Sequence, residues 1–245
     1  MVDSVLAALH IRLQQLSERE LRRLDEENVP WLPRLGTLPL QVTTREILRA
    51  LEASVTVSSC LQRVAWLYCW LMPRDMTGPW MVYRFGPSAL HVDSLTILWA
   101  LSYVLPSVGL PTTFDVRHFH GALYVCMIMR CGSHPFQRRY AVTFLVLWQE
   151  QRFVVAYAET SEDRFILANA LQVALEGASV ELLNGMYPDI NTAFSAAHTD
   201  LDGPTVFRLD KDPSLAARFV FTPNSDPQEQ TLDLSSVRRE QGQGR

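Results

Sequence analysis

Lysine is almost missing from this sequence, and its basic charge comes nearly all from arginine. Of the 22 basic residues, only Lys211 is a lysine, and the formal net charge is −4. Arginine and lysine solvate similarly on a surface, so we draw no function from the preference for arginine. The acidic balance excludes a uniformly basic nucleic-acid coat. Any contact with nucleic acid must therefore come from a local patch.

Motifs of nucleotide binding and catalysis are missing as well. The chain has no G-x-G-x-x-G and no P-loop. Residues 86–90 begin like a nucleophile elbow, but the second glycine is absent and a proline precedes the serine. His118, His120 and Asp115 form the densest group of possible metal ligands, yet the helical pattern that we expect there would separate the two imidazoles by about 200°. We expect no enzyme, metal, cofactor or small-molecule substrate.

Apolar runs long enough to span a membrane and secretion signals are also lacking. The longest uninterrupted apolar run, residues 64–72, is less than half of the ~20 residues that a membrane-spanning helix needs. Four cysteines lie in or beside apolar segments, and there is no N-x-S/T sequon or secretory signal: Cys60, Cys69, Cys126 and Cys131. We expect no membrane contact and a reducing intracellular compartment.

The pattern that is present is a duplication. An arginine followed by a long apolar run occurs at residues 63–72 and again at residues 139–148. Each run leads through a polar turn to a second run, at residues 80–85 and 153–158, and then to a helix, a short strand and another helix. The fold class predicted is α+β, with two pseudo-repeated ββαβα units forming a mixed or antiparallel sheet backed by helices.

The chain divides into five predicted parts. A short N-terminal helical segment covers residues 1–28, and a proline-rich linker covers residues 29–42. The first repeat covers residues 43–132 and the second, with added edge strands, residues 138–222. The polar tail, residues 223–245, is predicted to be disordered.

Local signals predict particular elements inside these parts. Residues 62–72 and 80–85 are predicted to pair as a hairpin, residues 95–105 to form a helix, and residues 117–130 to form another helix. Capping boxes predict helix starts at Ser17 with Glu20 and at Thr160 with Asp163. Phe207 and residues 218–221 are candidates for edge strands.

Arginines at the strand ends are the candidate nucleic-acid contacts. We expect them to gather at one end of the second hairpin, with two further arginines near the equivalent end of the first. Such a patch can contact phosphates even on an acidic protein, whereas the alternative is ordinary solvated strand ends. The residues are Arg130, Arg138, Arg139 and Arg152, with Arg117 and Arg84 at the other position.

Four segments of the first half of the chain carry a family resemblance: residues 47–58, 64–70, 80–85 and 115–125. In this order they resemble the centromere protein N family, the Chl4-like component of the inner kinetochore. The first three follow the order of the family's helix, strand and hairpin, and the fourth matches its next strand and helix. The resemblance covers about residues 40–130, and residues 1–21 also look like the family's first helix.

The resemblance implies a non-enzymatic subunit of the centromere-associated network in the nucleus. It implies pairing with a subunit like centromere protein L and contact with the centromeric nucleosome and its DNA. Asp3 would be an acidic contact to the histone and Arg12 a basic one. Ala7 stands where another acid is expected, and His10 where a lysine is usual.

Two alternatives stay open. The first is an adaptor subunit of an unrelated intracellular complex with no nucleic-acid contact. The second is a small-molecule enzyme that uses His118 and His120. Salt-sensitive binding to nucleosomal DNA would separate the kinetochore subunit from the adaptor.

Overall fold

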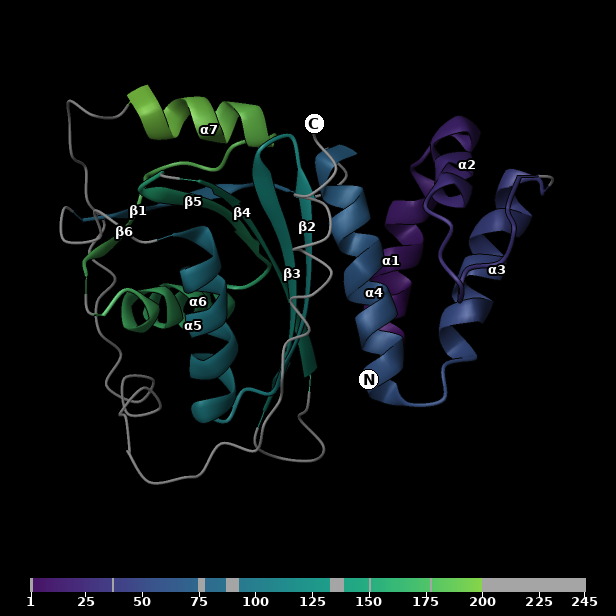
Figure 1. Cartoon of the computed structure of the whole chain (residues 1–245), viewed down its shortest axis with the longest axis horizontal. Helices are drawn as coiled ribbons and strands as arrows, with labels where there is room; N and C mark the ends of the chain where they lie inside the picture. The colour runs from purple at the N-terminus through teal and green to yellow at the C-terminus, as the bar shows by residue number, and fades with distance from the viewer. Residues whose placement is uncertain are drawn as a thin grey trace, which may run out of the picture.

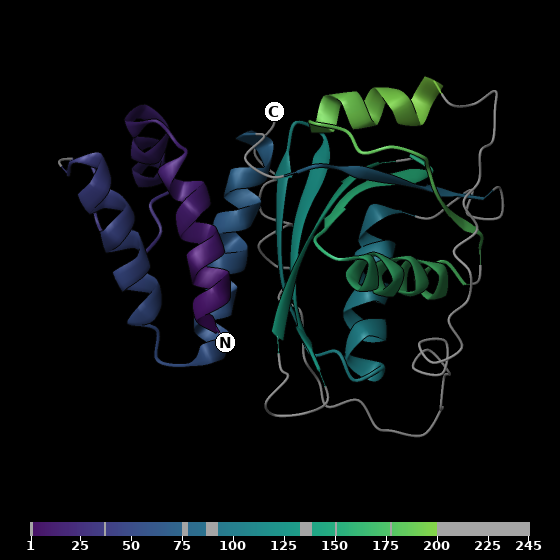
Figure 2. The same ribbon diagram turned by 180° about the vertical axis from the view of Figure 1, so that it is seen from behind.

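The computed structural model arranges the chain in three layers. Four N-terminal helices form one outer layer, a sheet forms the middle, and two helices cover the far face of the sheet (Figures 1 and 2). None of the described helices is long and apolar enough to cross a membrane. The structure describes residues 2–36, 38–74, 78–86, 93–132, 139–149, 151–176 and 178–199.

The helical layer contains the predicted N-terminal helical segment and also residues 40–74. Its members are α1 (Val2–Gln14), α2 (Glu18–Glu26), α3 (Leu40–Glu52) and α4 (Val57–Leu71), followed by the short 3-10 helix η1 (Met72–Arg74). The predicted capping box is confirmed at the start of α2. The Ser17 hydroxyl accepts the Glu20 amide at 3.3 Å, and the Glu20 carboxylate accepts the Ser17 amide at 2.9 Å.

The middle layer is a six-stranded antiparallel sheet in the order β2-β3-β4-β5-β1-β6. The β2–β3 hairpin turns through His120 and Gly121, whose φ values of 47° and 76° are typical of a two-residue type I′ turn. The strands are β1 (Met81–Phe85), β2 (Thr112–Phe119), β3 (Ala122–Cys131), β4 (Arg139–Trp148), β5 (Phe153–Ala158) and β6 (Val180–Leu182).

Helices cover both faces of the sheet. One face packs against α4, α1 and α7 (Ile190–Thr199), and the other packs against α5 (Ser94–Ser107) and α6 (Ser161–Ala174). In β4 the side chains of Phe144 and Val146 join the first core, whereas Leu145 and Leu147 join the second. The strand is therefore buried on both faces, as its nearly continuous apolar run predicts.

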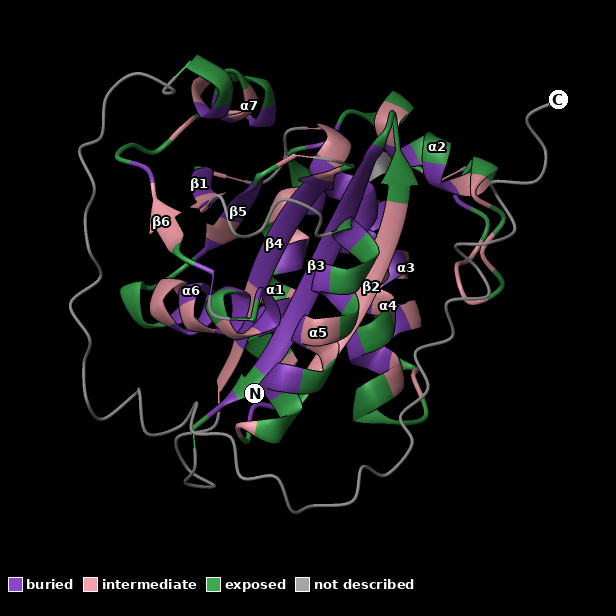
Figure 3. Cartoon of the chain, turned by 60° about the vertical axis from the view of Figure 1, so that its left-hand side comes forward, coloured by how far each residue is buried: buried purple, intermediate pink, exposed green. Residues whose placement is uncertain are grey.

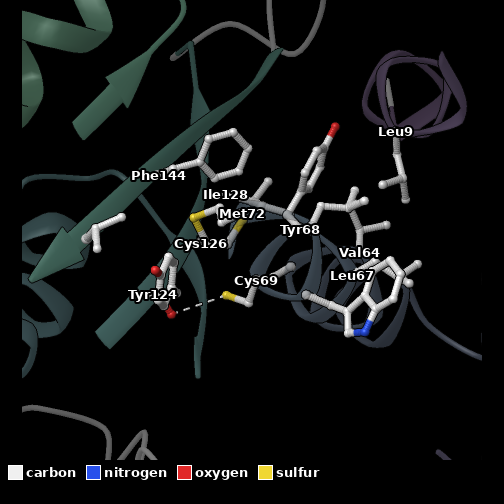
Figure 4. Packing of buried hydrophobic residues seen from close by; sticks show 14 of the residues in the cluster. Leu9, Val64, Leu67, Tyr68, Cys69, Met72, Tyr124, Cys126, Ile128 and Phe144 are labelled. Carbon is white, nitrogen blue, oxygen red and sulfur yellow. Dashed lines mark hydrogen bonds between the residues drawn. The ribbon is translucent and has the colours of Figure 1, made fainter. Parts of the chain in front are cut away.

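Residues 64–72 are helical, and the predicted strand and hairpin there are wrong. Thr56 and Ser59 form a capping box that starts α4, and β1 pairs with β5 and β6 instead. The helix is apolar nearly all round because it packs between two layers, with Leu9 of α1 on one side and Tyr124 and Phe144 of the sheet on the other (Figure 4). A continuous apolar run has no period, so sequence pattern cannot separate a buried helix from a buried strand.

The second wrong element is the helix predicted over residues 117–130. This stretch holds the end of β2, the turn and most of β3. The helix over residues 95–105 is confirmed as α5, although Pro106 lies inside its last turn rather than after it. The α+β class is confirmed, but the two ββαβα units are not found. One arginine-led run is α4 and the other is β4.

The elements predicted for the second half of the chain agree better with the structure than those of the first half. The β4–β5 hairpin is confirmed, and the Thr160 hydroxyl accepts the Asp163 amide at 3.1 Å at the start of α6. No helix or strand is assigned between Glu27 and Pro39 in the described residues there, but α3 begins at Leu40, inside the predicted linker 29–42. Phe207, residues 218–221 and the tail 223–245 lie outside the described residues.

A buried hydroxyl in β4 gives a stability prediction. The Thr143 side chain is fully buried, and its oxygen has no hydrogen-bond partner among the described residues. Thr143→Val removes this unpaired group at nearly constant shape, so we expect the free energy of unfolding to rise by about 1–2 kcal/mol in urea denaturation.

Thr43→Val is the matched control. The Thr43 hydroxyl is also buried but donates to the Pro39 carbonyl at 3.1 Å. We expect this control to lose about 1 kcal/mol. A Thr143→Val protein that is less stable than the wild type would contradict the prediction.

Candidate interaction surfaces

The predicted arginines lie at two opposite ends of the sheet. Strand register sets Arg130 opposite Tyr140 and Arg139 opposite Cys131, at the start of β4. Arg152 follows the far end of β4, at the turn into β5. Ten residues of extended chain separate those ends by roughly 30 Å. The expected gathering of Arg130, Arg139 and Arg152 at one end is therefore wrong.

Arg139 is used inside the molecule. Its guanidinium forms a two-pronged ion pair with Asp163 at 2.7 and 3.1 Å, and a further contact with Glu162 at 3.2 Å. These carboxylates, Asp163 first, raise the pKa of Arg139 above its usual value. Because the Asp163 side chain is only 1% exposed, the pair fixes the first turn of α6 to the edge of β4. This geometry argues against Arg139 as a phosphate contact.

Arg117 and Arg84 also make internal contacts. Arg117 donates to Glu27 at 2.7 Å, which ties the edge strand β2 to the end of α2, and its guanidinium lies 5.2 Å from the Trp66 ring. Arg84 donates to the Ala197 carbonyl at 3.2 Å, near the end of α7. Of the predicted patch, Arg130 and Arg152 are exposed. Arg138 lies outside the described residues.

Asp3 and Arg12 face different surroundings, although both belong to α1. Nine residues at 100° each place them on opposite sides of the helix. Asp3 is exposed, on the same face as Ala7 and Ile11. Arg12 is partly buried, with its guanidinium 5.9 Å from the Tyr157 ring of β5. The structure thus separates the two side chains that the resemblance assigns to the histone.

The possible ligands around His118 and His120 do not assemble a metal centre. The described residues contain no group of three or more His, Cys, Asp or Glu that could hold a metal ion. His118 lies in β2 and His120 in the turn, where its ring packs against Phe119 at 4.0 Å. All four cysteines are buried, and none of them forms a disulfide within the described part of the chain.

The most perturbed acid is Asp115, at the seam between β2 and α4. Its carboxylate accepts the Gln62 amide at 3.3 Å, while its second oxygen is buried and finds no partner within the described part of the chain. Burial raises the pKa of Asp115 to about 6, and hydrogen bonding from Cys69 only partly offsets this. Cys69 also donates to the Asp115 and Tyr124 carbonyls at 3.2 and 3.5 Å. The cluster joins α4 to β2 and β3.

A surface hollow of about 430 Å³ lies beside α2 and the linker. Asp25 is among its lining residues, but that carboxylate already accepts the Leu35 amide at 2.7 Å and so holds the linker in place. The remaining walls include Leu24, Val29 and Leu32, with Arg34 beside them. The carboxylate that lines the hollow is therefore already used to hold the linker in place.

Sequence reasoning missed a row of exposed apolar side chains on α5. Leu95, Trp99 and Tyr103 recur every four residues and are 39%, 63% and 45% exposed. The other side of α5 packs in the core. One signal was available, because residues 94–114 contain no charged residue at all. We call Leu95, Trp99 and Tyr103 the α5 stripe.

The fold and these surfaces define a three-layered α+β protein whose candidate contacts lie on exposed helices and strand ends. No protein-family model and no curated protein sequence matches the chain.

The Arg139–Asp163 pair gives a second stability prediction. Arg139→Ala leaves a nearly fully buried carboxylate without its counter-ion. Since Arg139 is itself 37% exposed, we expect a loss of about 2–3 kcal/mol in urea denaturation, below the ~3–5 kcal/mol of a fully buried pair. Arg130→Ala, on the adjacent strand, is the matched control and should change stability by less than about 0.5 kcal/mol. Equal losses in the two variants would refute the structural role of Arg139.

Asp115 gives a prediction that depends on pH. With a pKa of about 6 in the folded protein against 3.8 when unperturbed, the folded state binds more protons between these values. Stability therefore falls as pH rises through this window, by at most about 3 kcal/mol. We expect Asp115→Asn to match the wild type near pH 4 and to exceed its unfolding free energy by about 1–3 kcal/mol at pH 7.

Asp189→Asn is the control of opposite sign. Hydrogen bonds from Thr192 lower the pKa of Asp189, which caps α7 at the surface. The asparagine variant should therefore be less stable than the wild type at neutral pH. A parallel pH profile for Asp115→Asn and the wild type would contradict the assignment.

Proposed function

We propose that this protein is a non-enzymatic assembly subunit of the inner kinetochore, located in the nucleus at the centromere. It pairs with a subunit like centromere protein L and contacts the centromeric nucleosome. The resemblance of residues 40–130 to the centromere protein N family motivates the proposal. The exposed position of Asp3 on α1 is the structural observation that supports it.

The exposed face of α1 suits contact with a basic protein loop. Asp3 lies in the first turn of the helix, and its neighbours on that face include Ser4, Ala7, Ala8 and Ile11, none of them charged. A carboxylate on a face of small side chains lets an arginine of a histone approach closely. Arg12 has a different role in this proposal. It packs α1 against the sheet through Tyr157, and so orients the face that carries Asp3.

DNA contact, if it occurs, uses Arg130 and Arg152 separately. Their separation by roughly the length of β4 is too great for one phosphate but matches several phosphates along a duplex. Arg117 and Arg139 are left out because each already binds carboxylates.

The test is binding to reconstituted nucleosomes that carry the centromeric histone H3 variant. We expect Asp3→Asn to weaken binding about tenfold, because the negative charge that would pair with a histone arginine is lost while an acceptor oxygen remains. Glu26→Gln, which removes an exposed acid from α2, is the control and should bind like the wild type. Arg130→Ala and Arg152→Ala should each reduce the slope of affinity against salt by about one.

An adaptor subunit without nucleic-acid contact is the second candidate. The α5 stripe favours it, since exposed tryptophan and tyrosine on an uncharged surface are typical of protein interfaces. If the wild type fails to bind nucleosomes at low salt, or if Asp3→Asn and Glu26→Gln bind equally well, the kinetochore proposal fails and the adaptor takes its place.

A further inference from the structure

The α5 stripe is the largest grouping of exposed apolar side chains on one described element. Eight large apolar residues are exposed in the described part of the chain, and three of them form this stripe. The others are spread over different elements. Figure 3 shows α5 in front of the sheet, with exposed residues facing away from it. A solvated tryptophan with an aromatic and an aliphatic neighbour marks an interaction surface.

The absence of charged residues on α5 limits the kinds of partner that suit the α5 stripe. Residues 94–114 carry no charge, so α5 itself offers no basic residue to a phosphate or to an anionic membrane. A charged partner side chain placed over Trp99 would lose its hydration without gaining a counter-ion. The occupant must therefore present an uncharged apolar surface of its own.

The stripe itself is such a surface, and its spacing is symmetric about Trp99. We propose that α5 is a homodimer interface, in which two copies of this chain pack their stripes against each other around a two-fold axis at Trp99. With the helices antiparallel, Leu95 meets Tyr103 of the second copy, and Tyr103 meets Leu95 of the second copy. A two-fold contact closes on itself, so it gives dimers and not filaments. This inference goes beyond the proposed function and does not depend on it.

The exposed apolar area of the α5 stripe indicates the affinity expected for the dimer. Aromatic side chains bury about 150–250 Å² each, so with the exposed fractions given above two stripes offer on the order of 600 Å² in total. Stable complexes bury about 1,200 Å² or more, which places this one in the weak class. We expect a dissociation constant on the order of 10–100 µM, and hence a monomer at low concentration.

Sedimentation velocity of the full chain from about 1 to 300 µM tests the proposal over the expected range. The wild type should shift from monomer to dimer. Trp99→Glu places two carboxylates together at the axis, so we expect the dissociation constant to rise at least about tenfold. Val55→Glu is the control, because Val55 is 97% exposed on the loop before α4 and should leave dimerisation unchanged. Circular dichroism checks that each variant is folded.

Disulfide cross-linking gives a second test, which does not introduce a charged side chain into the interface. Under mild oxidation Trp99→Cys should form a disulfide-linked dimer, since the axis brings the two positions together, whereas Val55→Cys should not. The four native cysteines are buried and do not compete.

Three results would overturn the homodimer. One is a wild type that stays monomeric up to 300 µM, and another is a Trp99→Glu protein that dimerises as well as the wild type. The third is equal cross-linking of the two cysteine variants. If a monomeric wild type binds another protein and Trp99→Glu loses that protein, the stripe belongs to a different occupant. Nucleosome binding by Asp3 is measured separately, so the two proposals can fail independently.

Discussion

Burial of the central strands on both faces is the constraint on which the rest of the structure depends. β3 and β5 are almost wholly buried and β4 is buried over most of its length, and alternate side chains enter two separate cores. An antiparallel sheet with one solvent-exposed face would need polar residues at every second position of its strands, and these strands lack them. Helices must therefore cover both sides, which produces the three layers.

The position of α4 follows from that constraint. One side of α4 packs on β2 and β3, and the other side packs against α1 and α3. The N-terminal helices therefore share a continuous core with the sheet. Polar contacts hold the seam in place. Gln62 and Cys69 of α4 bind backbone and side-chain groups of β2, and Glu27 binds Arg117. In this seam the second carboxylate oxygen of Asp115 is buried without a hydrogen-bond partner in the ranges that the structure describes.

Charged residues divide into those that hold the fold and those that face solvent. Arg139, Arg117 and Arg84 attach α6, α2 and α7 to the sheet. Arg130, Arg152 and Asp3 remain on the surface, where they can meet a partner. The α5 stripe adds an uncharged surface on the far face of the sheet. Together these features suit a protein that acts by binding, and they place different contacts on different faces.

Local signals in the sequence were enough to predict the α+β class, the β4–β5 hairpin, α5 and the capping boxes of α2 and α6, because each depends on neighbouring residues. Residues 64–72 and 117–130 were mispredicted, since packing between two layers and pairing with β2 and β4 override local pattern there. Only tertiary structure decided which arginines are paired and which remain exposed. Residue types and spacing do not reveal strand register, and register separates Arg130 from Arg152 and brings Arg139 to the first turn of α6.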